Sequence, residues 1–146
     1  MIRPYTTKDK QQVIALLRLN TPQYFDVSEE ADLRHYLENE LESYFVAEEN
    51  NQVVGAGGIN YFLSERLARI SWDFVHPDVQ GKGIGKALLL HRIKEINSHP
   101  EIETIMVRTS QLAYRFYEKV GFKLEKTVKD FWAEGFDLYQ MKMSNK

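Results

Sequence analysis

The sequence predicts a single α/β (α+β) domain, residues 1–146, with a mixed sheet of about seven strands flanked by about four helices. Runs with helical spacing of apolar residues alternate along the chain with runs rich in β-branched and aromatic residues. No internal repeat and no Pro/Gly/Ser-rich linker divides the 146 residues, a length that suits one core. The resulting element order is β-α-α-β-β-β-α-β-α-β-β, which places helices on the faces of a sheet.

The first half of the chain is predicted to hold two helices and then a hairpin. After a short strand at residues 1–5, TTKDKQQVIALLRL has helical periodicity, with Thr6 or Thr7 as N-cap. SEEADLRHYLENEL repeats this pattern behind Ser28. Between them, NTPQYFDV is a Pro-broken aromatic loop of the kind that lies over a site. SYFVAEENNQVVGAGGINYFL then predicts two strands joined by a turn at residues 49–51.

The second half is predicted to alternate strands and helices. LARISWDFV forms a strand that ends at Pro77, followed by a helix over about residues 82–98 and the strand ETIMVRTS. QLAYRFYEKVG is a further helix that ends at Gly121, and FKLEKTV with FDLYQMKM closes the chain as an antiparallel pair. Alternation along LARISWDFV predicts two faces, one with Ile70, Trp72 and Phe74 and the other with Arg69, Ser71 and Asp73.

The composition excludes several classes of function. A net charge of −2 argues against general binding of nucleic acid, so an acidic ligand must meet a local basic patch. The chain has no cysteine, and its four histidines lack metal-ligand spacing, so neither thiolate chemistry nor a metal is expected. Because no signal-peptide core and no membrane-spanning apolar run occurs, we expect a cytoplasmic protein without a membrane partner.

The stretch HPDVQGKGIGKALLLHRI contains three glycines but fits neither common nucleotide loop. A Walker A loop is excluded because Ala87 follows Gly85-Lys86 and because Gln80 stands where the first glycine is required. A dinucleotide fingerprint is excluded because Ile84 or Leu88 occupies the place of its last glycine.

The same stretch has the properties of an anion site. A strand end, flexible glycines and a helix start leave free N–H groups at the positive end of the helix dipole, and Lys82 and Lys86 add charge there. A phosphate or pyrophosphate can bind such a site against bare backbone. The alternative, that the glycines only permit the turn, explains this stretch alone equally well.

Two motifs together resemble those of the GNAT acetyltransferase superfamily. QGKGIG at residues 80–85 is similar to the signature Q/R-x-x-G-x-G/A, and AYRFYEKVGF at residues 113–122 resembles the motif that follows one strand later. The order of the predicted elements agrees over essentially the whole chain. The resemblance implies a mostly antiparallel GNAT-like sheet with a splayed central pair of parallel strands. It also implies a transferase with acetyl-CoA as acyl donor and an amine as acceptor.

The resemblance further implies where CoA binds. The cleft is expected between the strand that ends at Val75 and the strand that ends near Arg108. The pantetheine arm is expected to pair with the backbone of Phe74 and Val75. The pyrophosphate is expected on backbone amides of the glycine loop, which comprises Gln80, Gly81, Lys82, Gly83, Ile84, Gly85 and Lys86.

Tyr117 matches the position of the family's frequent general acid. A phenol with a pKa near 10 stays protonated at neutral pH and can donate to a leaving thiolate, whose pKa is about 8.5. From the helix alone, a core aromatic beside Phe116 is the alternative. Ser110 stands seven residues before Tyr117, where the family often has asparagine, and a serine reaches the cofactor arm less far.

The acceptor amine must lose its proton before it attacks the thioester. At pH 7 the neutral form costs about 4.6 kcal/mol for a lysine-like amine and about 1.4 kcal/mol for an α-amino group. Asp73 is the leading candidate for the base, directly or through a water, and the alternative is an anchor for the substrate ammonium or a surface carboxylate. His76, Glu134 and Asp137 are further options.

Aromatic residues in two distant segments are predicted to wall the acceptor pocket, because the final hairpin usually borders it in the resembled family. These are Tyr24 and Phe25 in the first loop and Phe131 and Trp132 in the last hairpin, with Asp137 beside them. Core packing is the alternative for each aromatic.

Three functions remain open from the sequence. A small-molecule amine acetylated by direct ternary-complex transfer is preferred. A protein N-terminal or lysine acetyltransferase is the first alternative, because KTVKDFWAEGFDLYQMKM resembles the final hairpin of members that acetylate protein N-termini. A non-catalytic acyl-CoA-binding module is the second. A homodimer is compatible with any of them.

Overall fold

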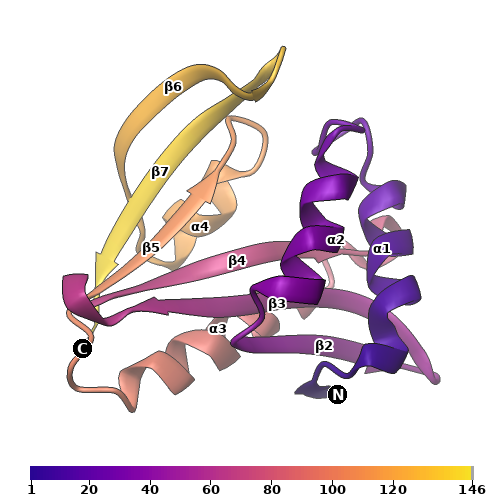
Figure 1. Cartoon of the computed structure of the whole chain (residues 1–146), viewed down its shortest axis with the longest axis horizontal. Helices are drawn as coiled ribbons and strands as arrows, with labels where there is room; N and C mark the ends of the chain where they lie inside the picture. The colour runs from indigo at the N-terminus through magenta and orange to yellow at the C-terminus, as the bar shows by residue number, and fades with distance from the viewer. Residues whose placement is uncertain (146) are drawn as a thin grey trace.

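The computed structural model describes residues 1–145 and confirms the predicted mixed sheet with helices on its faces (Figure 1). The strands of the seven-stranded sheet are β1 (Ile2–Pro4), β2 (Ser43–Glu49), β3 (Gln52–Phe62), β4 (Leu67–Val75), β5 (Thr104–Thr109), β6 (Lys123–Ala133) and β7 (Phe136–Ser144). The α-helices are α1 (Lys10–Leu19), α2 (Glu29–Asn39), α3 (Ile84–Asn97) and α4 (Tyr114–Val120), and three 3-10 turns are η1 (Thr7–Asp9), η2 (Leu63–Glu65) and η3 (Pro77–Val79).

The sheet contains one parallel pair of neighbouring strands, β4 and β5, within the order β1-β2-β3-β4-β5-β7-β6. All its other neighbours are antiparallel. The parallel pairing joins only Leu67–Ile70 to Thr104–Val107, after which the two strands separate (Figure 1). The splayed parallel pair that the resemblance implied is therefore confirmed.

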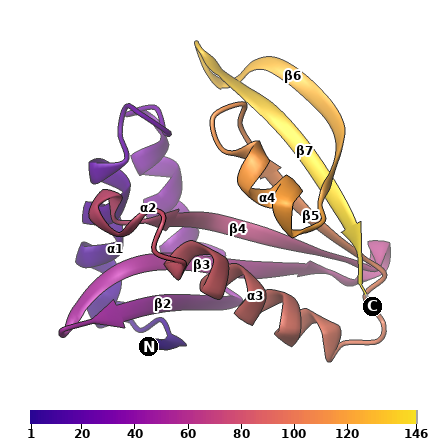
Figure 2. The same cartoon turned by 180° about the vertical axis from the view of Figure 1, so that it is seen from behind.

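Helices on the two faces of the sheet bury separate apolar clusters. Helices α1 and α2 lie over one face, and α3 and α4 lie over the other, as Figures 1 and 2 show from opposite sides. The first cluster includes Val13, Leu17 and Leu33, and the second includes Leu88 and Ile105, all essentially without solvent exposure. Each such side chain contributes about 1.5–3 kcal/mol by leaving water.

The turn before β3 and the turn before α3 contain residues that tolerate positive φ values. Asn50 and Asn51 have positive φ values of 51° and 63°, which suits the predicted hairpin turn between β2 and β3. Helix α3 begins at Ile84 rather than near Lys82, because Gly83 before it has a left-handed φ of 88°. The glycine loop thus lies outside the helix and in front of its free N–H groups.

The predicted alternation along β4 is wrong because the strand contains a β-bulge. The register with β3 shifts between Ala56 and Gly58, and Trp72 has a φ of +46°. Ile70 packs in the core under α3, whereas Trp72 and Phe74 pack on the opposite side, toward α1 and α2. The extra residue in the bulge reverses the phase of the strand, so Asp73 lies on the face of α3.

A buried arginine on α3 meets Asp73 across this bulge. Arg92 has no solvent exposure, and its Nη2 lies 2.9 Å from Asp73 Oδ1. Its Nε donates to the carbonyl of Leu88 at 3.0 Å, and its Nη1 donates to the carbonyl of Gly58 at 3.3 Å. The N–H groups of Nη2 are not directed at a hydrogen-bond acceptor among the described residues, so its contact with Asp73 is an ion pair rather than a hydrogen bond.

Gly57 provides the space that the guanidinium occupies. A Cβ added at Gly57 would lie 2.6 Å from Arg92 Cζ, closer than real Cβ contacts allow. The guanidinium is buried and contacts Asp73 and the carbonyls of Leu88 and Gly58, so moving it away from a new methyl group would disturb these contacts. The absence of a side chain at position 57 is therefore a condition for the ion pair.

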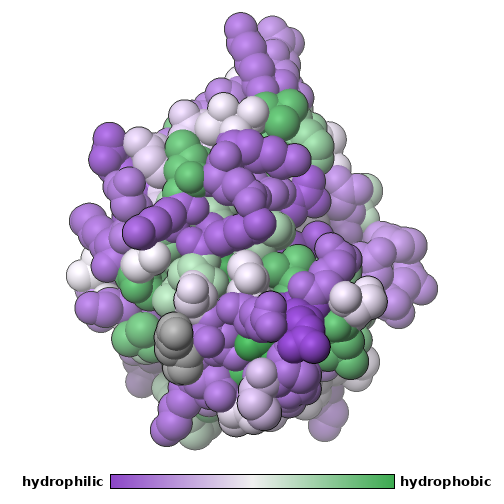
Figure 3. Space-filling view, turned by 90° about the vertical axis from the view of Figure 1, so that its left-hand side faces the viewer, coloured by the Kyte–Doolittle hydropathy of each residue, from purple (hydrophilic) through white to green (hydrophobic). Residues whose placement is uncertain are grey.

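The outer surface is mostly polar on the side that Figure 3 shows, with small separate apolar areas. Strand β6 forms one edge of the sheet, and nine of its eleven residues are exposed. No helix within residues 1–145 is long and apolar enough to cross a membrane.

We predict that Gly57→Ala lowers the free energy of unfolding by about 1–3 kcal/mol, because the new methyl group overpacks against Arg92. The measurement is urea unfolding followed by circular dichroism. Gly85→Ala is the matched control, since its Cβ would meet neighbours only at ordinary contact distances of 3.6 Å or more. Equal stability of the two variants would contradict the proposed packing role of Gly57.

Candidate functional site

A cavity of about 690 Å³ lies where β4 and β5 separate. Its walls come from both strands, from the glycine loop, from the start of α4 and from the α1–α2 region. Most of the residues predicted from the sequence line it, namely Tyr24, Phe25, Asp73, Phe74, Val75, Gln80, Gly81, Gly83, Gly85, Lys86, Ser110, Tyr117 and Trp132. Lys82, Ile84, Phe131 and Asp137 do not line this cavity.

The glycine loop presents a row of backbone amides without partners in the described part of the chain. The N–H groups of Gly81, Gly83 and the first three residues of α3 donate no hydrogen bond. Gly81 and Gly83 have φ values of 82° and 88°, and a Cβ at either would enter open space. The amides and the helix dipole therefore offer a polar, positively charged cradle that fits a pyrophosphate.

Asn20, which the sequence analysis missed, ties β4 to this loop. Its Nδ2 donates to the carbonyls of Leu16 and Val75 at 2.8 and 2.9 Å, and its Oδ1 accepts from Gln80 Nε2 at 3.3 Å. The residue is 2% exposed. It fixes the end of the strand against the loop, and only the fold brings positions so distant in sequence together.

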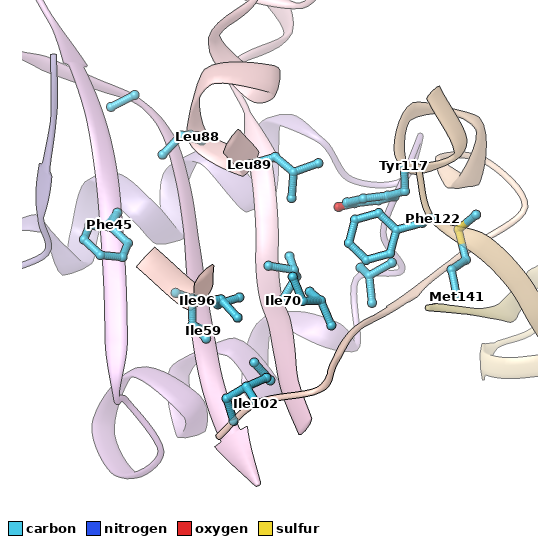
Figure 4. Close-up of a cluster of buried hydrophobic side chains, with 14 of the residues drawn as sticks. Phe45, Ile59, Ile70, Leu88, Leu89, Ile96, Ile102, Tyr117, Phe122 and Met141 are labelled. Carbon is cyan, nitrogen blue, oxygen red and sulfur yellow. The ribbon is translucent and has the colours of Figure 1, made fainter. Parts of the chain in front are cut away.

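Tyr117 and Asp73 meet across the splay. Tyr117 Oη donates to Asp73 Oδ2 at 2.8 Å, while Asp73 Oδ1 faces Arg92. Figure 4 shows the Tyr117 ring beside Phe122, and the two rings meet edge to face at 5.8 Å between centroids. Phenol, carboxylate and guanidinium therefore form one buried chain from α4 through β4 to α3.

This environment keeps the Tyr117 phenol protonated. Burial and the neighbouring negative charge of Asp73 raise the pKa of Tyr117 well above its usual value of 10.0. Tyr117 is both a core aromatic and a wall of the cavity, so the two readings of this residue from the sequence do not exclude each other. Asp73, by contrast, contacts both the Tyr117 hydroxyl and the Arg92 guanidinium.

Ser110 and His76 act as local caps in the structure. Ser110 Oγ accepts from the amide of Leu112 at 3.2 Å, just before α4, and the residue is 7% exposed. His76 Nδ1 accepts from the amide of Asp78 at 3.0 Å in the turn η3. The His76 ring is therefore occupied in shaping the turn and does not line the cavity.

The aromatic walls come from the expected segments. Phe25 stacks on Trp72 with 6.4 Å between centroids and meets Phe74 edge to face at 5.8 Å. Trp132 Nε1 donates to the carbonyl of Thr109 at 3.1 Å, which holds the β6–β7 hairpin over the cavity. Phe25 and Trp132 therefore line the cavity from two distant segments of the chain.

The last hairpin contributes no carboxylate to the cavity. Asp137 Oδ1 accepts from the amide of Asp130 at 2.9 Å, and Glu134 is exposed in the turn between β6 and β7. Asp137 thus stabilises the hairpin instead of facing the cavity.

Glu29, at the start of α2, was also missed from the sequence. It is 6% exposed, lines the cavity, and accepts from the amide of Asp26 at 2.9 Å. Burial raises the pKa of the Glu29 carboxyl to about 7 despite that hydrogen bond. The sequence offered only an acidic first turn of a helix, a feature that is usually solvated.

Two arginines at the branch point of the strands were not singled out as site residues either. Arg69 on β4 and Arg108 on β5 line the cavity, and neither forms an ion pair within residues 1–145. The guanidinium of Arg108 lies 5.0 Å from the centroid of the Phe131 ring and 5.7 Å from that of Trp132. The cavity thus holds unmatched positive charge as well as the carboxylate of Glu29.

A family model described as "Acetyltransferase (GNAT) domain" matches residues 6–145 of the chain. Among curated proteins, an N-alpha-acetyltransferase of Sulfurisphaera tokodaii is 30% identical over 166 aligned positions, covering 96% of this chain and 90% of that protein. An amino-acid acetyltransferase of Actinobacillus pleuropneumoniae (serotype 5b) is 30% identical over 94 residues, which make up 64% of this chain but only 21% of that protein. The chain therefore spans about one fifth of the length of the latter relative.

Solved structures share the same fold. The ribosomal-protein-S18-alanine N-acetyltransferase of Escherichia coli superposes with a TM-score of 0.82 at 20% identity, covering 100% of this chain and 94% of that one. The N-acetylglutamate synthase of Neisseria gonorrhoeae, solved with coenzyme A and N-acetyl-glutamate, gives 0.79 at 20% identity, covering 100% and 35%. These structural likenesses show the shared fold, and the family match over nearly the whole length shows that the chain belongs to the GNAT acetyltransferase family.

Proposed function

We propose that the protein transfers the acetyl group of acetyl-CoA directly to the primary amine of a small molecule. The observation that carries this proposal is that one cavity joins the unpartnered amides of the glycine loop to the hydroxyl of Tyr117. The loop suits the donor's pyrophosphate, and the phenol suits its leaving sulfur. The Neisseria gonorrhoeae synthase, solved with coenzyme A, supports this choice of donor.

The donor lies along the splay in this proposal. The pyrophosphate binds the amides of the glycine loop, where the helix dipole of α3 and the charge of Lys86 offset its charge. The pantetheine arm follows the edge of β4 at Phe74 and Val75, which β5 leaves without a strand partner beyond Ile70. Ser110 faces the same space with a hydroxyl that already caps a turn.

The chemical step forms one bond and breaks another. The neutral amine attacks the thioester carbonyl carbon, the C–N bond forms, and the C–S bond breaks as its electron pair goes to sulfur. Tyr117 donates its proton to the developing thiolate. Because the pKa of Tyr117 is raised, its hydroxyl stays protonated throughout the neutral pH range.

Asp73 is better suited to position Tyr117 than to deprotonate the amine. One oxygen of the Asp73 carboxylate faces Arg92, and the other accepts a hydrogen bond from the Tyr117 hydroxyl. If Asp73 gave up either contact to reach the amine, a buried polar group would lose its partner. We propose Glu29 as the group that takes the amine proton, directly or through a water, because it is a buried carboxylate on the acceptor side of the same cavity. In this proposal Asp73 does not act as the base, and its carboxylate positions the Tyr117 hydroxyl.

A protein N-terminus is the second candidate acceptor. The Sulfurisphaera tokodaii relative, an N-alpha-acetyltransferase, favours it, since the alignment covers most of both chains. Release of free CoA from acetyl-CoA, measured across free amines and peptides, separates the two acceptor classes. Tight binding of acetyl-CoA without turnover on any amine, peptide or protein would instead indicate a non-catalytic CoA-binding module.

We predict that Tyr117→Phe lowers kcat about 100-fold and leaves the Kd of acetyl-CoA almost unchanged, because only the proton donor is removed. Steady-state kinetics and fluorescence titration measure the two quantities. Tyr114→Phe on the same helix is the control, since its hydroxyl makes no hydrogen bond within the described chain. An unchanged kcat of the Tyr117 variant with a good substrate would remove the acid assignment.

We predict that kcat/KM rises with pH to a plateau above about pH 7, because Glu29 must be ionised to accept a proton. In Glu29→Gln this limb disappears and the plateau falls about 100-fold. The control is Glu30→Gln, whose native carboxylate pairs only with Arg18 and Arg34 on the outer surface.

Asp73→Asn distinguishes the two carboxylates. It is expected to retain the limb near pH 7 and to lose about 3–5 kcal/mol of stability, because Arg92 keeps a buried charge without its partner. Loss of the limb in Asp73→Asn, with the limb intact in Glu29→Gln, would reverse the two roles.

A further inference from the structure

We propose that the acceptor amine carries a carboxylate and that Arg69 and Arg108 bind this carboxylate at the branch point of β4 and β5. The proposal rests on the acetyltransferase function above and specifies its substrate class. It follows from the position, the unmet hydrogen-bonding capacity and the surroundings of the two guanidinium groups.

The two arginines lie on one face of the sheet beside the last parallel pairing. Arg69 pairs with Met106, and Arg108 is two residues further along β5, so both side chains lie on the face opposite Ile70 and Val107. From strand spacing, their Cα atoms are about 8 Å apart. That separation lets two long side chains converge on one small group in the cavity that both of them line.

Neither guanidinium has a protein partner for its charge. No carboxylate within residues 1–145 lies within ion-pair distance of Arg69 or Arg108, and neither side chain donates a hydrogen bond to these residues. Arg108 Nε is buried without an acceptor. Burial and the like charge of Arg69 lower the pKa of Arg108.

Aromatic rings hold the two cations in place without neutralising them. Arg108 lies over Phe131 and Trp132, and Arg69 lies 4.8 Å from the centroid of the Phe62 ring. A guanidinium stacked on a ring keeps its edge N–H groups free, and these match the two oxygens of a carboxylate. An anion that enters the cavity would satisfy Arg108 Nε and relieve the repulsion between the arginines.

The charges on the cavity wall complement an amine that bears a carboxylate. Glu29 supplies a carboxylate for the ammonium or its proton, and the arginine pair supplies the site for the anion. Of the other acidic groups on the cavity, Asp73 pairs with Arg92, and the exposed Glu40 lies beside His35. An amine without an anionic group would leave the positive charges of both arginines without a partner.

The test compares substrates that differ only in the anion. We would measure kcat/KM for proteinogenic L-amino acids, their carboxamides and the corresponding decarboxylated amines. A preference of about 100-fold for the free acid is expected, because a charged hydrogen-bonded group is lost in the analogues. Turnover of carboxamides as fast as that of the acids would overturn the carboxylate site and leave the acetyltransferase function intact.

Two further arms identify the source and type of the anion. Peptides with Asp or Glu at their second position, set against matched Asn or Gln peptides, test a side-chain carboxylate, and an acidic preference there also supports the arginine site. Phosphoethanolamine tests phosphate, and a preference for it over every carboxylate would overturn the proposal.

Arg108→Gln and Arg69→Gln should each remove most of the preference for the acid. Arg66→Gln, whose native side chain pairs with Glu103 outside the cavity, should retain it.

Binding provides a readout that does not depend on turnover. Both tryptophans of the chain, Trp72 and Trp132, line the cavity, so their fluorescence reports a ligand there. Saturable quenching by an amino acid but not by its carboxamide, lost in Arg108→Gln, supports the site even where no acetylation occurs. In that case the catalytic proposal fails and the carboxylate site stands. Equal quenching by acid and amide overturns the site.

Discussion

The buried ion pair between Arg92 and Asp73 is the constraint on which the rest of the site depends. It joins α3 to β4 inside the core, and it is possible only because Gly57 leaves room for the guanidinium and because a bulge turns Asp73 toward α3. Replacing such a pair by apolar residues is often neutral for stability, whereas breaking it is costly. Its presence is therefore better explained by what it orients, which is the hydroxyl of Tyr117.

The separation of β4 from β5 opens a cavity beside Asp73 and Tyr117. Beyond Ile70 the two strands exchange no backbone hydrogen bonds, so one edge of β4 is free for a ligand. The Tyr117–Asp73 hydrogen bond crosses the gap, and Asn20 fixes the end of β4 to the glycine loop. Side-chain hydrogen bonds thus bound the cavity where the two strands separate and at the end of β4.

In the proposed function, charged groups of the cavity wall serve the donor and the acceptor separately. The glycine loop offers dipoles and lysine charge for phosphates, while Glu29 and two arginines without an ion pair among residues 1–145 line other parts of the wall. Keeping a carboxylate with a pKa of about 7 and two free guanidinium groups in one partly buried space costs stability. Such a cost is characteristic of groups that await a ligand.

The sequence by itself determined the element order, the glycine loop and the positions of Tyr117 and Ser110, because periodicity, turn residues and short motifs are local properties. The hairpin at Asn50 and the splayed strand pair followed from the same signals and the resemblance. Only the tertiary structure decided which face Asp73 occupies, because a one-residue bulge reverses strand alternation without a mark in the sequence. It also decided the partners of Arg92 and the burial of Glu29, since an isolated charged residue looks solvated until distant elements pack around it.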